Sequence, residues 1–156
     1  MVKMLDTYNN LSQKDIQDFE TSNSIELTDN YKEFLLKWNG GIPSPSTFII
    51  SEEEKDVSGV NYFYSIGDSD SDNDLEVFLD ILRLRLPEGF ISIADDPVGN
   101  AILSGISGPH YDQIYFWDHE NEPDLDEPDM SNMYFLADNI WEFLDSLYED
   151  ESDDDE

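Results

Sequence analysis

The stretch Gln113-Ile-Tyr-Phe-Trp-Asp-His-Glu120 decides the fold of this chain. Its first part, Ile114 to Trp117, is a short run of large apolar and aromatic residues. Such a run predicts a central strand that is buried on both faces. Its second part, the triplet Asp118-His119-Glu120, places one of the two histidines of the chain between two carboxylates. The triplet is therefore the first candidate for a functional site, and the alternative is that it forms ordinary protein surface.

Two more strands precede this one closely. The patterns over Phe90–Ala94 and Ala101–Ile106 each predict a strand. The segment between them, Asp95–Asn100, has the composition of a turn, because Pro presets φ while Gly and Asn accept positive φ. A second tight connection, Ser107–Asp112, leads into the central strand. Three strands joined by connections this short can pair only as an antiparallel meander.

Apolar residues that recur at spacings of three and four predict helices elsewhere. The predicted helices cover residues 11–20, the segment between Thr28 and Asn39, residues 75–86 and residues 138–148. The second helix carries an aromatic stripe that includes Tyr31 and Trp38, which is typical of a core-facing side. Gly40 and Gly41 are expected to end it, because Gly tolerates the left-handed conformation that a helix stop needs.

The remaining segments complete a fold-class prediction. Further strands are predicted over 47–50, 60–66 and 133–135, with loops over 52–58 and 122–130. The order of elements predicts an α+β fold: a single antiparallel or mixed sheet of about five to six strands, with helices packed mainly on one face. Residues 1–148 are expected to form one domain, and 149–156, with seven acids in eight residues, a disordered acidic tail.

Charge is the most unusual property of the composition. The chain has 38 acidic residues against 7 Lys and Arg, a formal net charge of -31, and no base follows Arg85. Such a surface repels nucleic acid and anionic membranes, and it attracts basic partners over a Debye length of about 10 Å. The alternative is that the acidity serves solubility, for instance in a salty cytoplasm. Composition alone leaves both readings open.

Compartment and membrane association follow from what the sequence lacks. There is no Cys, which excludes disulfides and thiolate chemistry and fits a reducing compartment. No apolar run approaches the roughly 20 residues that a membrane-spanning helix needs. Residues 1–10 contain no apolar stretch of the kind found in signal peptides. We therefore expect a cytoplasmic protein.

The triplet is a poor catalytic or metal-binding candidate. On a strand, Asp118 and Glu120 would share one side and His119 the other. Zinc usually takes three or more protein ligands, and only His110 adds a second histidine. A general acid–base pair would lack a neighbouring nucleophile or phosphate-binding motif. Besides catalysis or metal binding, two interpretations remain: the triplet hydrogen-bonds the turn Asp95–Asn100 and closes the meander, or it contacts a partner.

Two other patterns do not match the ligand-binding motifs that they partly resemble. The segment Asp68–Asp74 begins like a calcium-binding loop, but Asn73 stands where that loop needs Gly and Leu79 where it needs a bidentate Glu. Gly40-Gly41 and Gly99-Asn100 lie in no phosphate-binding pattern and are expected to be turn formers. No catalytic residue, metal ligand or cofactor is predicted.

Three segments together resemble the SUKH superfamily. Residues 31–41, Tyr-Lys-Glu-Phe-Leu-Leu-Lys-Trp-Asn-Gly-Gly, resemble its hallmark N-terminal helix and turn. Residues 90–100 resemble its strand, acidic turn and Gly-Asn, and residues 113–120 its Val-Tyr-Phe-Trp-Asp-His-Glu strand. The resemblance extends over about residues 11–148, with Thr28 standing where the family often has Pro. The superfamily groups fungal cell-wall-synthesis regulators of the Smi/Knr type with many bacterial immunity proteins.

The resemblance implies a mixed α+β fold without established catalytic activity. For bacterial members it implies neutralisation of a toxin, often a nuclease, by direct binding. With the acidity, this predicts a basic protein toxin as partner, and neither nucleic acid nor membrane. The predicted contacts lie in the acidic connections: Asp95, Asp96, Asp118, His119, Glu120, Glu122 and Asp124. The motif positions assigned to structure are Tyr31, Trp38, Gly40, Gly41, Gly99, Asn100, Tyr115, Phe116 and Trp117.

Two alternatives stay open. The first is a regulatory scaffold like the fungal relatives, although those are long chains with disordered flanks. The second is a metal-dependent hydrolase that uses the carboxylates of Asp118 and Glu120.

Overall fold

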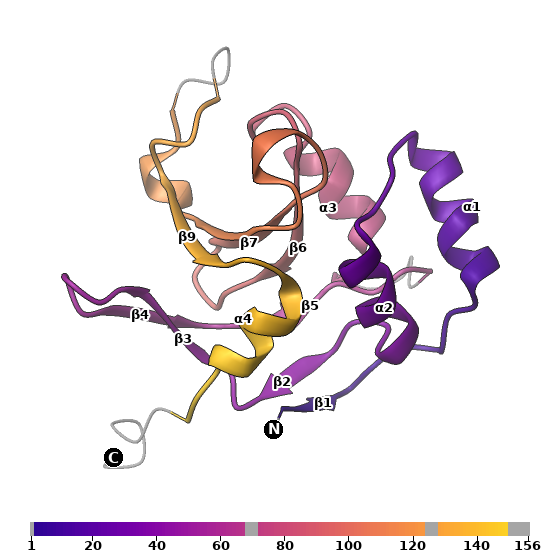
Figure 1. Ribbon diagram of the computed structural model, residues 1–156, viewed down its shortest axis with the longest axis horizontal. Coiled ribbons are helices and arrows are strands. Elements are labelled where there is room, and N and C mark those ends of the chain that lie inside the picture. The colour runs from indigo at the N-terminus through magenta and orange to yellow at the C-terminus, as the bar shows by residue number, and fades with distance from the viewer. Residues whose placement is uncertain (1, 68–71, 124–127, 150–156) are drawn as a thin grey trace.

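The main element of the fold is a five-stranded antiparallel sheet in the order β5-β6-β7-β8-β9. The computed structural model describes residues 2–67, 72–123 and 128–149 (Figure 1). The strands of this sheet are β5 Tyr62–Phe63, β6 Phe90–Asp95, β7 Ala101–Gly105, β8 Ile114–Trp117 and β9 Met133–Ala137. Neighbours in the sheet are neighbours along the chain, so the predicted meander is confirmed.

The central strand β8 is buried on both faces, as its sequence predicts. Ile114 and Phe116 belong to the larger hydrophobic core, while Tyr115 and Trp117 belong to a smaller core. This division follows from the period of two along a strand, which sends successive side chains to opposite faces of the sheet. The smaller core also contains Leu82 and Leu86, so the end of α3 and the chain that follows it help to cover the second face.

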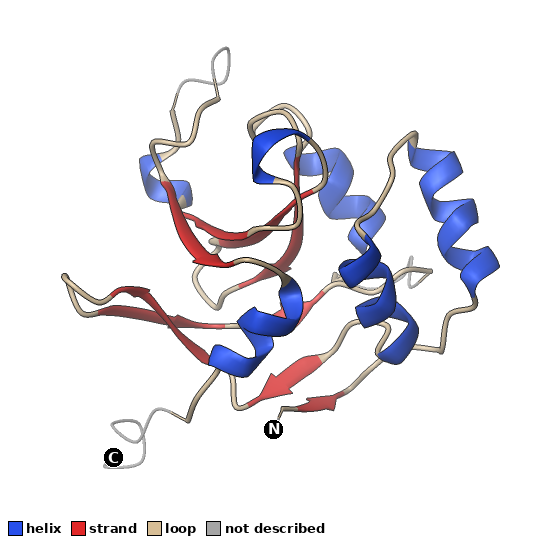
Figure 2. Cartoon of the chain, viewed as in Figure 1, coloured by secondary structure: helices blue, strands red, loops and turns tan. Residues whose placement is uncertain are grey.

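The described residues contain four α-helices, and a side chain caps the start of each. The helices are α1 Gln13–Asn23, α2 Asp29–Lys37, α3 Leu75–Leu82 and α4 Ile140–Ser146 (Figure 2). Ser12 and Asp15 form a reciprocal capping box at the start of α1, and the Thr28 hydroxyl accepts from the Tyr31 N–H at the start of α2. Helix α3 ends at Leu82, earlier than the predicted Leu86.

Helices α2 and α4 pack against each other above the larger core. The rings of Phe34 on α2 and of Trp38, the residue after α2, lie 6.2 and 6.3 Å from that of Trp141 on α4. Tyr31 is 1% exposed and stacks on Phe34. The aromatic stripe of α2 is thus part of the core, as expected. None of the helices in the described residues is long and apolar enough to cross a membrane.

The expectation of a single sheet needs correction. Strand β3, Thr47–Ser51, pairs with β4, Asp56–Gly59, in a separate two-stranded sheet. Strand β1, Lys3–Leu5, pairs with β2, Ile42–Ser44, in another. The loop predicted over 52–58 therefore contains most of a strand. The sequence Asp-Val-Ser-Gly of β4 has no alternating apolar pattern, so its extended conformation depends on pairing with β3.

The two glycines after α2 have a different role from the predicted helix stop. Helix α2 already ends at Lys37, with an extended Trp38 as its C-cap. Gly41 exchanges two backbone hydrogen bonds with Phe63 of β5, of 3.0 and 2.8 Å. Gly40 and Gly41 both have positive φ, of 75° and 126°. The glycines thus allow the chain to approach β5 closely.

Candidate functional site

The turn after β6 is built around Asp96. Asp96 is 3% exposed, and its carboxylate accepts from the N–H groups of Val98 and Asn100 at 3.1 and 2.8 Å. It also accepts from the Asn100 side-chain amide at 2.9 Å and from the Ser58 hydroxyl at 2.9 Å. The carboxylate predicted to contact a partner is thus hydrogen-bonded within the molecule. This carboxylate is buried and holds the turn to strand β4.

The acidic triplet does not continue the strand. Strand β8 ends at Trp117, and Asp118 caps a short 3-10 helix, η2, His119–Asn121. The Asp118 carboxylate accepts from the Glu120 N–H at 3.0 Å and from the Asn121 side-chain amide at 2.6 Å. The strand geometry that would place Asp118 and Glu120 on one side is therefore absent. The metal-dependent hydrolase hypothesis assumed these two carboxylates on one side of a strand, and that assumption does not hold.

The triplet and the turn after β6 are joined, as the structural reading of the triplet predicts. The His119 N–H donates to Asn100 Oδ1 at 3.1 Å, and His119 Nε2 lies 3.0 Å from the Val98 carbonyl oxygen. Gly99 lies against the imidazole, since a Cβ there would be 3.4 Å from Nε2. The contact closes the end of the β6–β7–β8 meander. It gives Gly99 and Asn100 a structural role, because Gly99 leaves room for the imidazole and Asn100 accepts the His119 N–H.

Glu122 is also engaged inside the molecule. Its carboxylate forms a bidentate pair with Arg85, with donor–acceptor distances of 3.0 Å from Nε and 2.8 Å from Nη2. The Arg85 guanidinium lies over the Trp117 ring, 5.1 Å from its centre. The hydrogen bond to Glu122 raises the pKa of Arg85 above its ordinary value. This ion pair covers the smaller core, so Glu122 is not a free surface acid.

The other residues predicted to contact a partner differ in exposure. Glu120 is exposed, Asp95 and His119 are half-buried, and Asp124 lies outside the described residues. Most of the Asp68–Asp74 segment and, apart from Glu149, the acidic tail also lie outside them. In the described part of the chain, no three His, Asp or Glu side chains are arranged to hold a metal ion.

Asp95 gives a pH-dependent prediction. Burial raises the pKa of this carboxyl, although the Asn61 side-chain amide donates to it at 3.0 Å. The folded state therefore binds the proton more tightly than the unfolded state. The tighter proton binding stabilises the folded state in acid, and this stabilisation is lost as the pH rises through the folded-state pKa of Asp95.

We expect Asp95→Asn, which keeps an oxygen for Asn61, to raise the urea midpoint above that of the wild type at about pH 7. The difference should be smaller at about pH 5. A difference that does not change with pH would contradict this origin.

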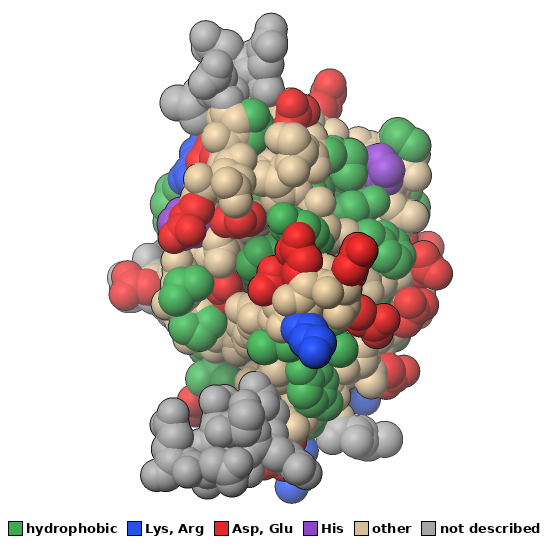
Figure 3. Space-filling model, turned by 90° about the vertical axis from the view of Figure 1, so that its left-hand side faces the viewer, with side chains coloured by type: hydrophobic (Ala, Val, Ile, Leu, Met, Phe, Trp, Pro, Cys, Tyr) green, Lys and Arg blue, Asp and Glu red, His purple; other side chains and the backbone are tan. Residues whose placement is uncertain are grey.

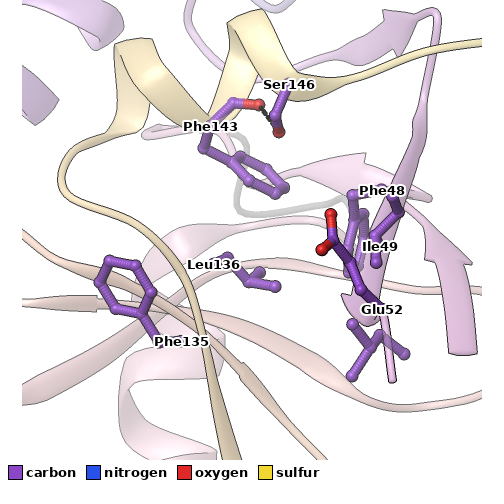
Figure 4. A pocket seen from close by; sticks show the side chains of 8 residues that line it. Phe48, Ile49, Glu52, Phe135, Leu136, Phe143 and Ser146 are labelled. Carbon is purple, nitrogen blue, oxygen red and sulfur yellow. Dashed lines mark hydrogen bonds between the residues drawn. The ribbon is translucent and has the colours of Figure 1, made fainter. Parts of the chain in front are cut away.

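An apolar groove that the sequence did not predict lies between the β3–β4 hairpin and the edge strand β9. Its cavity of about 270 Å³ is lined by Phe48, Ile49, Ile50, Glu52, Phe135, Leu136, Phe143 and Ser146. We call it the β9 groove. Figure 4 shows Leu136 between Phe135 on one side and the β3 side chains on the other. Ile49 and Phe135 are 43% and 49% exposed, respectively.

Acidic residues adjoin the β9 groove. The turn between β3 and β4 carries Glu52, Glu53 and Glu54 with one base, Lys55, and β4 begins with Asp56; all of them are exposed. Figure 3 shows this side of the molecule, on which apolar side chains lie exposed between acidic ones. One signal in the sequence is visible in retrospect: β9, Met-Tyr-Phe-Leu-Ala, has no charged residue, although 29% of the chain is charged.

Comparison with known proteins gives one match. No curated protein matches the chain. The sequence model of the SMI1 / KNR4 family (SUKH-1) matches residues 10–146, from just before α1 to the last residue of α4. The match includes the α2 motif, the turn after β6, strand β8 and its acidic triplet, so the resemblance drawn from these segments is confirmed. This chain belongs to the SMI1 / KNR4 family (SUKH-1).

Proposed function

We propose that this protein is a non-catalytic immunity protein that neutralises a cognate toxin with a basic surface, such as a nuclease, by direct binding. The observation that carries the proposal is the acidity of a chain from this family. Four of the seven bases are already paired with acids: Lys14 with Asp18, Lys32 with Glu20, Arg83 with Asp80 and Arg85 with Glu122. Few positive charges therefore interrupt the negative field of the surface.

Such a field suits a partner that handles nucleic acid. A nuclease grips phosphates with Lys and Arg, which leaves a basic surface wherever its substrate binds. An acidic protein is drawn to that surface, and complementary charge raises association rate constants towards about 10⁸ M⁻¹s⁻¹ at low salt. Affinity then comes mainly from a few apolar or aromatic anchors that are buried in the complex. The exposed side chains of the β9 groove offer such anchors.

The test is inhibition of a purified toxin. The natural candidate is a toxin domain encoded beside the gene of this protein, expressed separately and assayed for cleavage of DNA or RNA. We expect inhibition to saturate at a fixed stoichiometry. We also expect the association rate to fall at least about tenfold when the salt concentration rises from about 50 to about 500 mM. An association rate that does not change with salt concentration would exclude the electrostatic mechanism. Absence of inhibition would exclude the proposal.

Family membership also supports a second function, that of a regulatory protein like the cell-wall-synthesis regulators. The two are distinguished by the number of partners. An immunity protein binds one cognate toxin tightly, whereas a regulatory scaffold binds several unrelated proteins at the same surface. Binding measurements with purified candidate partners separate these outcomes.

A further inference from the structure

We propose that the edge of strand β9 accepts an extended segment of the partner as an added β-strand, and that this segment carries Lys or Arg beside its apolar residues. The inference rests on the proposed function and names the surface and the partner chemistry that it requires. Three features of the described residues carry it: the direction of the β9 backbone groups, the composition of β9, and the side chains of the β9 groove.

The backbone of β9 directs pairing groups away from β8. The Asp118 N–H donates to the Asn132 carbonyl at 3.0 Å, which makes these two residues a hydrogen-bonded pair. Hydrogen-bonded and non-hydrogen-bonded pairs alternate along antiparallel strands. The pair Phe116–Tyr134 is then hydrogen-bonded, and the pair Tyr115–Phe135 is not. The N–H and C=O of Phe135 therefore point away from β8, towards the side where the sheet ends.

No strand of the same sheet covers that side in the described chain. Strand β9 is the last in the order β5-β6-β7-β8-β9, and the β3–β4 hairpin forms a separate sheet. Proteins usually protect an exposed edge with Lys, Pro or an inward-pointing charge, because an open edge pairs with other chains. The sequence of β9 contains none of these, and the register shift of the β8–β9 ladder lies after Phe135, between the pairs Tyr115–Phe135 and Ile114–Ala137. Tyr134 and Phe135 are 36% and 49% exposed. Such an edge is typical of proteins that bind peptides by strand addition.

The groove beside this edge suits the side chains of an added strand. Alternate residues of such a strand point to opposite faces. On one face they would meet exposed Ile49 and half-buried Leu136, which lie over the buried rings of Phe48 and Phe143. Glu52 lines the same groove, and exposed Glu120 follows β8 near the start of β9. The surroundings are thus apolar with acidic residues nearby, which favours an apolar strand that also bears basic residues.

Charge also selects between two possible occupants. A second copy of this chain could pair β9 with β9, but each copy carries a net charge of -31. Like charges of this size oppose association of two copies. A basic segment of another protein gains from the same field. We therefore assign the edge to a partner strand and treat self-pairing as an outcome of the test.

The first experiment uses synthetic peptides and the intact protein. The probe is a peptide of about seven residues that alternates Lys and Val, so that one face of its strand is apolar. One control replaces the central Val with Pro, which removes a pairing N–H. A second control replaces every Lys with Glu. We expect binding, measured by fluorescence anisotropy, only for the Lys–Val peptide.

Amide exchange locates the binding. The Phe135 N–H should gain protection when the Lys–Val peptide binds, because it then donates to the added strand. The Tyr134 N–H already faces β8 and should change little, which makes it an internal control. Binding without protection at Phe135 would overturn the proposal. Protection at Phe135 in the protein alone, together with a dimer in sedimentation, would show self-pairing and would equally overturn it.

Variants link the groove to function. Phe135→Lys and Ile49→Lys each place a positive charge at an exposed apolar position of the groove, and each should weaken peptide binding at least about tenfold. The matched control is Leu84→Lys, because Leu84 is 78% exposed and lies outside the groove lining. All three variants should keep the cooperative urea unfolding of the wild type.

The outcomes separate this inference from the proposed function. Toxin inhibition that is unchanged by Phe135→Lys, with no protection of the Phe135 N–H in the complex, would refute strand addition and leave the immunity function intact. Peptide binding at β9 without inhibition of the toxin would support strand addition and refute the immunity function.

Discussion

Replacing Gly40 with Ala should lower the free energy of unfolding by about 3–5 kcal/mol, measured by urea denaturation. Gly40 has a φ of +75°, which a residue with a Cβ adopts only at a cost. A Cβ at this position would lie 2.6 Å from the Phe63 carbonyl oxygen and 2.8 Å from that of Tyr64. Both are backbone atoms of the β5 region and cannot rotate away, so the strand itself must shift.

Gly108→Ala separates the cost of the positive φ from the cost of close packing against β5. Gly108 has a similar φ of +81°, but no atom lies within 4 Å of the position that its Cβ would take. Its substitution should therefore cost only the backbone strain, about 1–2 kcal/mol. Equal losses for the two variants would show that close packing against β5 contributes nothing. Because domains of this size are stable by about 5–15 kcal/mol, the difference is readily measured.

Asn39→Ala should have an effect of similar size, about 3–4 kcal/mol, because it leaves the two buried backbone groups of Ile66 and the part-buried carbonyl of Asn9 without their partner. Asn39 is 1% exposed. Its side-chain amide donates to the carbonyls of Asn9 and Ile66 at 2.8 and 2.9 Å, and its Oδ1 accepts from the Ile66 N–H at 2.8 Å. One side chain thus ties the N-terminal segment and the chain after β5 to the end of α2.

The control for this variant is Asn61→Ala. Asn61 also donates from its side-chain amide, to Asp95 at 3.0 Å, but it does so in an exposed position where water replaces the lost partner. Its loss should change the free energy of unfolding by less than about 1 kcal/mol. If Asn39→Ala were no more destabilising than Asn61→Ala, the buried hydrogen bonds of Asn39 would not contribute as argued.

These two variants concern the β5 end of the sheet, whereas the proposed strand addition concerns the β9 end. Gly40 and Asn39 contact residues around β5, and the groove residues Phe135 and Ile49 lie beside the opposite edge strand. Stability and binding should therefore be separable. Substitutions at the first pair act on unfolding, and Lys substitutions at the second pair act on partner affinity.

The sequence predicted the α+β class and the β6–β7–β8 meander because those signals are local. Apolar runs, helical spacing and turn residues act over a few neighbours in the chain. The short strands β1, β2 and β4 gave no such signal. Each becomes extended only by pairing: Asp56–Gly59 with β3, and Ile42–Ser44, which contains Pro43, with β1. Their pairing therefore comes from tertiary contacts that a local pattern does not record.

The same limit applies to the candidate site. The sequence located the acidic residues but not their partners. Asp96 and Glu122 were counted as surface acids, yet the first is buried in its turn and the second pairs with Arg85. The β9 groove was missed because its lining comes from β3, β9 and α4, which only the folded chain brings together.

By itself, the sequence determined the family, the acidic character, the meander and the buried strand Ile114–Trp117, because charge and periodicity are properties of the chain itself. The tertiary structure decided which carboxylates are used internally and that the Asp118-His119-Glu120 segment closes the meander against the turn after β6. It also decided that β9 is an edge strand of the five-stranded sheet. These features depend on which strands pair and which polar groups meet, and such contacts exist only after folding.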